Sequence, residues 1–105
     1  MALGSEDGLN VVGQAASIAE ANPITRDLEP GVVVLDLSLP DGSGVELCRD
    51  LNESIPSTAC IIHTGTLRES EMEAATEAGA VAVVLKSLSG TDFLDVIHAA
   101  PSAKR

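Results

Sequence analysis

Three residues of this sequence could act together on a phosphoryl group, namely Asp36, Thr64 and Lys86. Each of them ends or directly follows a short aliphatic run that is predicted to be a strand. A carboxylate can attack phosphorus as a nucleophile, a hydroxyl can donate to a phosphoryl oxygen, and an ammonium can pair with its charge. If the strands are parallel, their carboxyl ends share the edge where open α/β sheets bind ligands. The spacing therefore predicts phosphate chemistry with Asp36 as the acceptor.

The runs that carry these residues are apolar, rich in β-branched residues and closed by turn signals. Such runs are typical of strands that are buried on both faces. Strands are predicted at 32–36, 58–64 and 80–85, with a weaker candidate at 9–15. Amphipathic helices are predicted between and after them, at 17–28, 45–51, 69–78 and 91–100. This alternation predicts an α/β fold, in which right-handed crossovers join parallel strands and helices cover both faces of the sheet.

Local signals define the ends of several helices. Ser17 followed by Glu20 predicts a capping box at the first helix. The pair Asn22-Pro23 predicts that this helix is interrupted or kinked. Gly79 is suited to end the third helix, and a polar tail is expected from Pro101 onward.

Composition predicts one globular domain over residues 1–105. The hydrophobic content is 45%, and six basic residues stand against sixteen acidic ones, for a formal net charge of −10. Such a charge repels nucleic acid and anionic membranes, and no apolar run approaches the roughly 20 residues of a membrane span. Cys48 and Cys60 lack metal-ligand spacing and are expected to be buried thiols. Without a signal peptide pattern, a cytoplasmic protein is expected.

Several motifs occur together in a recognisable order. They are Val33–Gly44, which holds the Leu-Pro-Asp-Gly-Ser-Gly turn, then Ile61–Gly65, and finally Glu77–Ala80 leading to Val84–Lys86. Over residues 9–100 the chain resembles a response regulator receiver domain, the CheY-like module of two-component signalling. The turn and the Gly-Ala strand entry resemble the NarL/FixJ/LuxR type, whose receivers precede a helix-turn-helix domain.

The resemblance implies a fold and a role for each site residue. The fold would be a flavodoxin-like (CheY-like) doubly wound parallel sheet. Asp36 would be the phosphoacceptor, Thr64 the switch hydroxyl and Lys86 the phosphoryl-pairing lysine, while Asp36 and the backbone carbonyl of Ser38 would be ligands of Mg²⁺. A sensor histidine kinase would donate the phosphoryl group. A degenerate receiver would instead act by binding another signalling protein, independently of phosphorylation.

The sequence departs from the family pattern at its N-terminus. The family's first strand and first helix are absent, so the sheet is expected to be truncated to four strands. The acidic pair that completes the family's Mg²⁺ site ends that strand, which leaves Asp36 and one carbonyl as a poor Mg²⁺ site. Glu6-Asp7 is a weak substitute because no apolar strand precedes it. A sheet that lacks an inner strand also predicts direct strand pairing or a homodimer.

Other interpretations of the same residues stay open. Asp36 could cap the turn through local backbone bonds, Lys86 could be a solvated loop lysine that pairs with Asp36, and Thr64 could be an ordinary strand residue. His63 is expected to point opposite to Thr64 and to be a packed or hydrogen-bonded histidine, not a ligand or phosphodonor. As a function, a small phosphohydrolase with Asp36 as nucleophile is the alternative, but Ser38 stands where such enzymes carry a second Asp. The expected function is therefore signalling, without enzymatic activity and without direct contact to nucleic acid.

Overall fold

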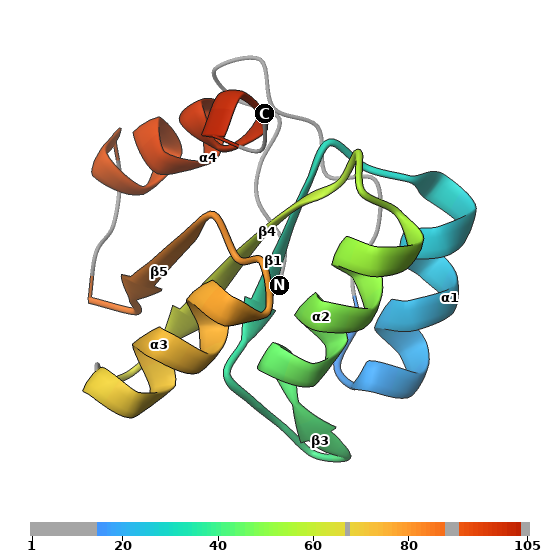
Figure 1. Cartoon of the computed structure of the whole chain (residues 1–105), viewed down its shortest axis with the longest axis horizontal. Coiled ribbons are helices and arrows are strands. Elements are labelled where there is room, and N and C mark those ends of the chain that lie inside the picture. Colours follow the sequence, from blue (N-terminus) through green and yellow to red (C-terminus); the bar gives the residue numbers. More distant parts are fainter. Residues whose placement is uncertain (1–14, 67, 88–90, 104–105) are drawn as a thin grey trace.

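A parallel sheet forms the centre of the molecule. The computed structural model describes residues 15–66, 68–87 and 91–103. Within them the sheet has the order β1 (Val32–Asp36), β4 (Ala59–Thr64), β5 (Ala82–Leu85) (Figure 1). All six residues of the middle strand, β4, are buried. Its register pairs Asp36 with His63 and Thr64 with Leu85, so the carboxyl ends of the three strands lie together.

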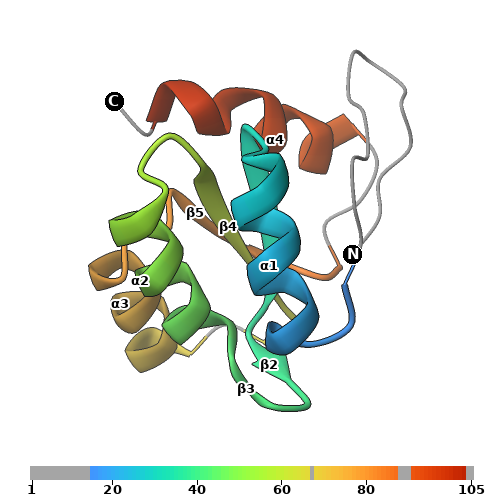
Figure 2. The same ribbon diagram turned by 90° about the vertical axis from the view of Figure 1, so that its right-hand side faces the viewer.

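Helices cover both faces of this sheet. They are α1 (Ile18–Leu28), α2 (Gly44–Ser54), α3 (Glu69–Glu77) and α4 (Thr91–Ala103). Figure 2 shows α4 on one side of the sheet, opposite α2 and α3. Two hydrophobic clusters fill the space between the layers, one under α2 and α3 around Leu47, Leu51 and Ile62, and one under α4 around Ile61 and Phe93. No helix in the described part of the chain is long and apolar enough to span a bilayer.

A short antiparallel ribbon connects β1 to α2. It consists of β2 (Ser38–Leu39) and β3 (Gly42–Ser43), with Ser38 opposite Ser43. Gly42 has a φ of 151°, and a Cβ there would lie 2.8 Å from Ile18 Cδ1. Only glycine is therefore accommodated at this position without strain. Ser43 then caps α2, because its Oγ accepts a hydrogen bond from the Val45 N–H.

The same ribbon holds the start of α1. Both oxygens of the Asp41 carboxylate accept backbone N–H groups from the first turn of α1, from Ile18 at 2.8 Å and from Ala19 at 3.0 Å. These two bonds and the dipole of α1 stabilise the negative charge, and the bonds lower the pKa of Asp41 below its usual value. Asp41 therefore attaches the ribbon to a helix that precedes it in the chain.

The structure confirms most of the predicted elements. β1 has the predicted bounds, β4 and β5 fall inside the predicted ranges, and the four helices lie where they were expected. Ser17 caps α1 as predicted, since its Oγ accepts the Glu20 N–H. The Glu20 carboxylate accepts a hydrogen bond from the Ala16 N–H and not from that of Ser17. Cys48 and Cys60 are reduced and buried. Gly79 follows α3 with a φ of 98°.

Other predictions were wrong. The helix α1 is not interrupted at Asn22-Pro23, because the structure has one helix from Ile18 to Leu28 with Pro23 inside it. The last helix continues past Pro101 to Ala103. Val32, Val33 and Val34 are only half-buried, since β1 has β4 as its one neighbour in the described sheet. The ribbon of β2 and β3 was not predicted, and the candidate strand 9–15 and Glu6-Asp7 fall outside the described residues, apart from residue 15.

Candidate functional site

The carboxyl ends of the three strands bring an acid and a base together. Lys86 follows β5 directly, and its Nζ lies 3.3 Å from Oδ1 of Asp36, the last residue of β1. The Lys86 backbone N–H donates to the Thr64 carbonyl at 2.7 Å. This bond fixes the position of the Lys86 backbone at the end of β4. The lysine therefore reaches across the end of β4 to the carboxylate. An ammonium in this position can neutralise the charge of an anion that is bound at Asp36.

His63 is a third member of this group, and sequence reasoning did not assign it to the site. It lies on β4 opposite Asp36, and its Nδ1 is 4.0 Å from Asp36 Oδ1. The imidazole stacks on Phe93 of α4, with ring centroids 5.0 Å apart and planes inclined by 10°. Asp36, His63 and Lys86 are called the strand-end cluster below. The position of His63 opposite Asp36 follows from the register that pairs Val32 with Ala59, which the sequence alone does not give.

Burial determines the charge state of His63. Removal from water lowers the pKa of the imidazole below 6.5, because it disfavours the charged form. The neighbouring charges act in opposite directions, since Asp36 raises this pKa and Lys86 lowers it. The net shift is downward, so His63 is neutral near pH 7.

The Thr64 hydroxyl is hydrogen-bonded within the loop that follows β4. Its Oγ1 donates to the Thr66 carbonyl at 2.9 Å and accepts the Thr66 N–H at 3.4 Å. These bonds form a local turn at the end of β4. The structure thus places Thr64 at the predicted edge of the sheet, with its hydroxyl engaged in the loop that follows.

Asp36 is held in place by tight backbone packing. A Cβ built on Gly44 would overlap the Asp36 carbonyl oxygen, so only glycine fits at this position. The Gly44 N–H donates to the Leu37 carbonyl at 2.9 Å, and the Leu37 N–H donates to the His63 carbonyl at 3.3 Å. The Asp36 carboxylate itself accepts no backbone hydrogen bond from the described residues, so it does not cap the turn. Its oxygens are left for Lys86 and for a ligand.

The described residues do not form a Mg²⁺ site. Mg²⁺ prefers an octahedron of oxygen ligands. In the strand-end cluster the single carboxylate faces an ammonium and an imidazole. Ser38, whose carbonyl was the second predicted ligand, is exposed on β2. Nowhere in the described ranges do three or more His, Cys, Asp or Glu side chains come together in a way that could hold a metal ion.

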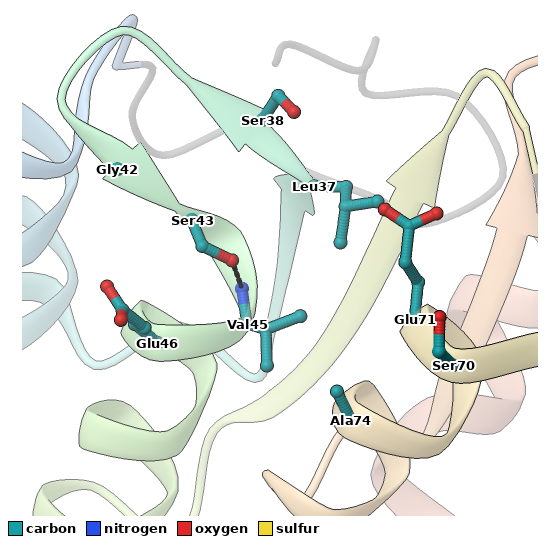
Figure 3. Close-up of a pocket in the computed structure, with 9 residues that line it drawn as sticks. All are labelled: Leu37, Ser38, Gly42, Ser43, Val45, Glu46, Ser70, Glu71 and Ala74. Atoms are coloured by element: carbon teal, nitrogen blue, oxygen red, sulfur yellow. Dashed lines mark hydrogen bonds between the residues drawn. The ribbon is translucent and has the colours of Figure 1, made fainter. Parts of the chain in front are cut away.

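An open groove lies next to the ribbon, and its lining includes Leu37 and Ser38, which directly follow Asp36. It has a volume of about 350 Å³ and is lined by residues of the ribbon, α2 and α3 (Figure 3). The carboxylates of Glu46 and Glu71 flank it, and none of its lining residues is basic. An acidic lining repels a phosphate, so the groove does not extend the anion site at Asp36.

The sequence is similar to a known protein family and to proteins of known type. The family model described as the response regulator receiver domain matches residues 2–98. The DNA-binding transcriptional activator DevR/DosR of Mycobacterium tuberculosis is 43% identical over 91 residues, which cover 87% of this chain and 42% of that protein. The response regulator protein VraR of Staphylococcus aureus is 28% identical over 96 residues, covering 91% of this chain and 46% of VraR. The chain thus spans less than half the length of these relatives.

Solved structures show the same fold. A two-component response regulator of the LuxR family from Aurantimonas sp. superposes with a TM-score of 0.87 at 30% identity, covering 97% of this chain and 73% of that one. The receiver domain of the putative response regulator NarL from Mycobacterium tuberculosis has a TM-score of 0.87 at 21% identity, over 92% of this chain and 78% of that one. The latter supports the fold alone.

Proposed function

The chain belongs to the family of response regulator receiver domains of two-component systems, and we propose that its Asp36 accepts the phosphoryl group. A carboxylate oxygen of Asp36 attacks the phosphorus of a phosphohistidine. The P–N bond breaks, its electron pair leaves with the donor imidazole, and an aspartyl phosphate forms. The donor in this proposal is a sensor histidine kinase.

One observation carries the proposal, namely the contact between Asp36 and Lys86. The ammonium lies 3.3 Å from the carboxylate, at the strand ends where ligands bind in this class of fold. In the free protein it neutralises the carboxylate, and after transfer it pairs with an oxygen of the phosphoryl group. The open position of Asp36 at the end of β1 leaves its carboxylate accessible to a donor.

Mg²⁺ is not part of the proposed step, because the described donor set does not suit it. The rate of transfer from acetyl phosphate, measured in EDTA and in excess Mg²⁺, tests for a metal site. Strict dependence on Mg²⁺ would require carboxylate ligands beyond those described, and equal rates would mean that Asp36 is phosphorylated without a metal ion. Thr64 would take part as the switch only if its hydroxyl leaves the Thr66 carbonyl.

The test is intact-mass spectrometry after incubation with acetyl phosphate. The wild type is expected to gain one HPO₃ unit, with acetate as the leaving group. Asp36→Asn is expected to gain none, and Asp50→Asn, a change of an exposed aspartate on α2, is the matched control that retains the gain. An unmodified wild type would contradict the phosphoacceptor role and would favour the phosphorylation-independent interaction module.

The remaining functional proposals concern enzymatic activity and partners. No phosphatase activity is proposed, because Ser38 occupies the position of the second aspartate in phosphohydrolases; turnover of a chromogenic phosphate ester would contradict this. The formal charge of −10 supports binding to proteins and not to nucleic acid. A kinase partner of this class would place the chain in the cytoplasm. A homodimer stays a prediction that light scattering can check.

A further inference from the structure

His63 differs in character from the other residues on its face of the sheet. Ala59 and Ile61 precede it on the same face of β4 and pack into the apolar cluster under α4. An aliphatic side chain would continue this pattern. His63 instead presents an imidazole whose apolar ring face stacks on Phe93 and whose Nδ1 lies near Asp36.

The ring nitrogens of His63 are buried without hydrogen bonds. The residue is 9% exposed, and within the described part of the chain neither Nδ1 nor Nε2 has a hydrogen-bond partner. A buried polar group without a partner destabilises a fold. The distance of 4.0 Å between Nδ1 and Asp36 Oδ1 is too long for a hydrogen bond to the bare carboxylate. The imidazole therefore lies near the acceptor position with a polar edge that the described residues do not satisfy.

A phosphoryl group on Asp36 supplies the missing acceptor. It adds three acceptor oxygens to the carboxylate, between the Nδ1 edge of His63 and the ammonium of Lys86. We propose that His63 is a phosphoryl-binding residue, whose Nδ1–H donates a hydrogen bond to the phosphoryl group on Asp36 beside the charge of Lys86. This inference rests on the proposed function, since it requires an anion at Asp36. Burial keeps the imidazole neutral near pH 7, and a neutral imidazole carries one N–H donor.

Three substitutions separate hydrogen bonding from packing. His63→Leu keeps an apolar body but has no donor. His63→Asn places an amide N–H close to the position of Nδ1 and gives up the stack on Phe93. His63→Gln reaches the position of Nε2, which faces away from the proposed bond.

The experiment measures the affinity of each protein for beryllofluoride, a noncovalent mimic of the phosphoryl group, together with urea unfolding. The wild type and His63→Asn are expected to bind with similar affinity. His63→Leu and His63→Gln are expected to bind about tenfold more weakly, the loss of one hydrogen bond to a charged group. Stability is expected in a different order, with His63→Leu at least as stable as the wild type and His63→Asn less stable.

The outcomes distinguish this inference from the proposed function. Binding by His63→Leu that equals binding by the wild type would overturn the role of His63 and leave Asp36 as acceptor. If the affinity for beryllofluoride falls in the same order as the stability of the His63 variants, His63 has a structural role only. This result would also overturn the inference. A wild type that neither binds beryllofluoride nor gains mass with acetyl phosphate would overturn the proposed function itself, and the role of His63 with it.

Discussion

The ribbon begins two residues after Asp36, yet the ribbon and the strand-end cluster differ in how far their polar groups are hydrogen-bonded. In the ribbon, Asp41 accepts two backbone N–H groups and Ser43 accepts one. In the strand-end cluster, His63 has two buried nitrogens without hydrogen bonds in the described structure, and Asp36 has only the distant Nδ1 and one ammonium beside it. The ribbon thus contributes to folding stability, whereas the cluster retains unsatisfied polar groups that a ligand can use.

The largest loss of folding stability is expected where the backbone of Gly44 packs against that of Asp36. Gly44→Ala would force a Cβ to within 2.0 Å of the Asp36 carbonyl oxygen, so one of the two backbone segments would have to shift. Urea unfolding followed by far-UV circular dichroism should show a loss of stability of about 3 kcal/mol or more.

Gly31→Ala is the matched control for this variant. A Cβ at Gly31 would meet nothing within 4 Å. The stability of this variant should therefore stay within about 0.5 kcal/mol of the wild type. Similar stability of the two variants would show that the close approach at Gly44 does not constrain Asp36.

The second-largest loss of stability is expected for a change in the ribbon, at Asp41. Asp41→Ala removes two hydrogen bonds and a negative charge from the N-terminus of α1. Its urea midpoint should fall between those of Gly44→Ala and Gly31→Ala. Asp50→Ala, which changes an exposed aspartate on α2, should leave the midpoint nearly unchanged. Equal midpoints for the two aspartate variants would mean that Asp41 does not support α1.

The dependence of stability on pH should separate the two regions. Because burial lowers the pKa of His63 below 6.5, the unfolded chain takes up this proton at higher pH than the folded chain. Stability is therefore full above the unfolded pKa of the imidazole and falls as the pH drops below it, by at most about 1.4 kcal/mol per pH unit. The N–H groups of Ile18 and Ala19 lower the pKa of Asp41 below 3.8. The contribution of Asp41 is consequently lost only as the pH falls below that value.

Urea midpoints across this pH range check the assignment. In His63→Leu the step below pH 6.5 should disappear, while the step below pH 3.8 remains. If the upper step persisted in this variant, its source would be another group, and the distinction between the regions would not rest on His63.

The smallest effect on stability is expected at Asp36 itself. Its side chain is 38% exposed and that of Lys86 is 50% exposed, so their ion pair is well solvated. Asp36→Asn should change the free energy of unfolding by less than about 1 kcal/mol, even though it removes the proposed phosphoacceptor. A loss as large as that of Gly44→Ala would show that Asp36 also carries part of the fold.

The sequence predicted the elements well because their patterns are local. Runs of β-branched residues and the spacing of apolar residues in helices depend on neighbours along the chain. The approach of Lys86 to Asp36 also followed from the shared edge of parallel strands. These features can be predicted without knowing which residues of neighbouring strands pair.

Features that depend on register or on distant contacts were missed. His63 is packed as predicted, since it is buried and stacks on Phe93. Its place opposite Asp36 was missed, because only the pairing of β1 with β4 shows it. The capping of α1 by Asp41 was also missed, because Asp41 is 23 residues away from Ile18 in the chain. The direction of the Thr64 hydroxyl follows from the loop at Thr66, whose conformation no periodicity predicts.

The attachment of Asp41 to α1 has a consequence for the order of synthesis. The helix α1 leaves the ribosome before the aspartate that completes its N-terminus, and 23 residues separate Ile18 from Asp41. At roughly 5–20 residues per second, this interval corresponds to about one to five seconds of translation. During that time Ser17 can cap the N-terminus of α1, whereas Asp41 has not yet been synthesised. The nascent chain therefore gains its full first helix only after β1 and the ribbon have emerged.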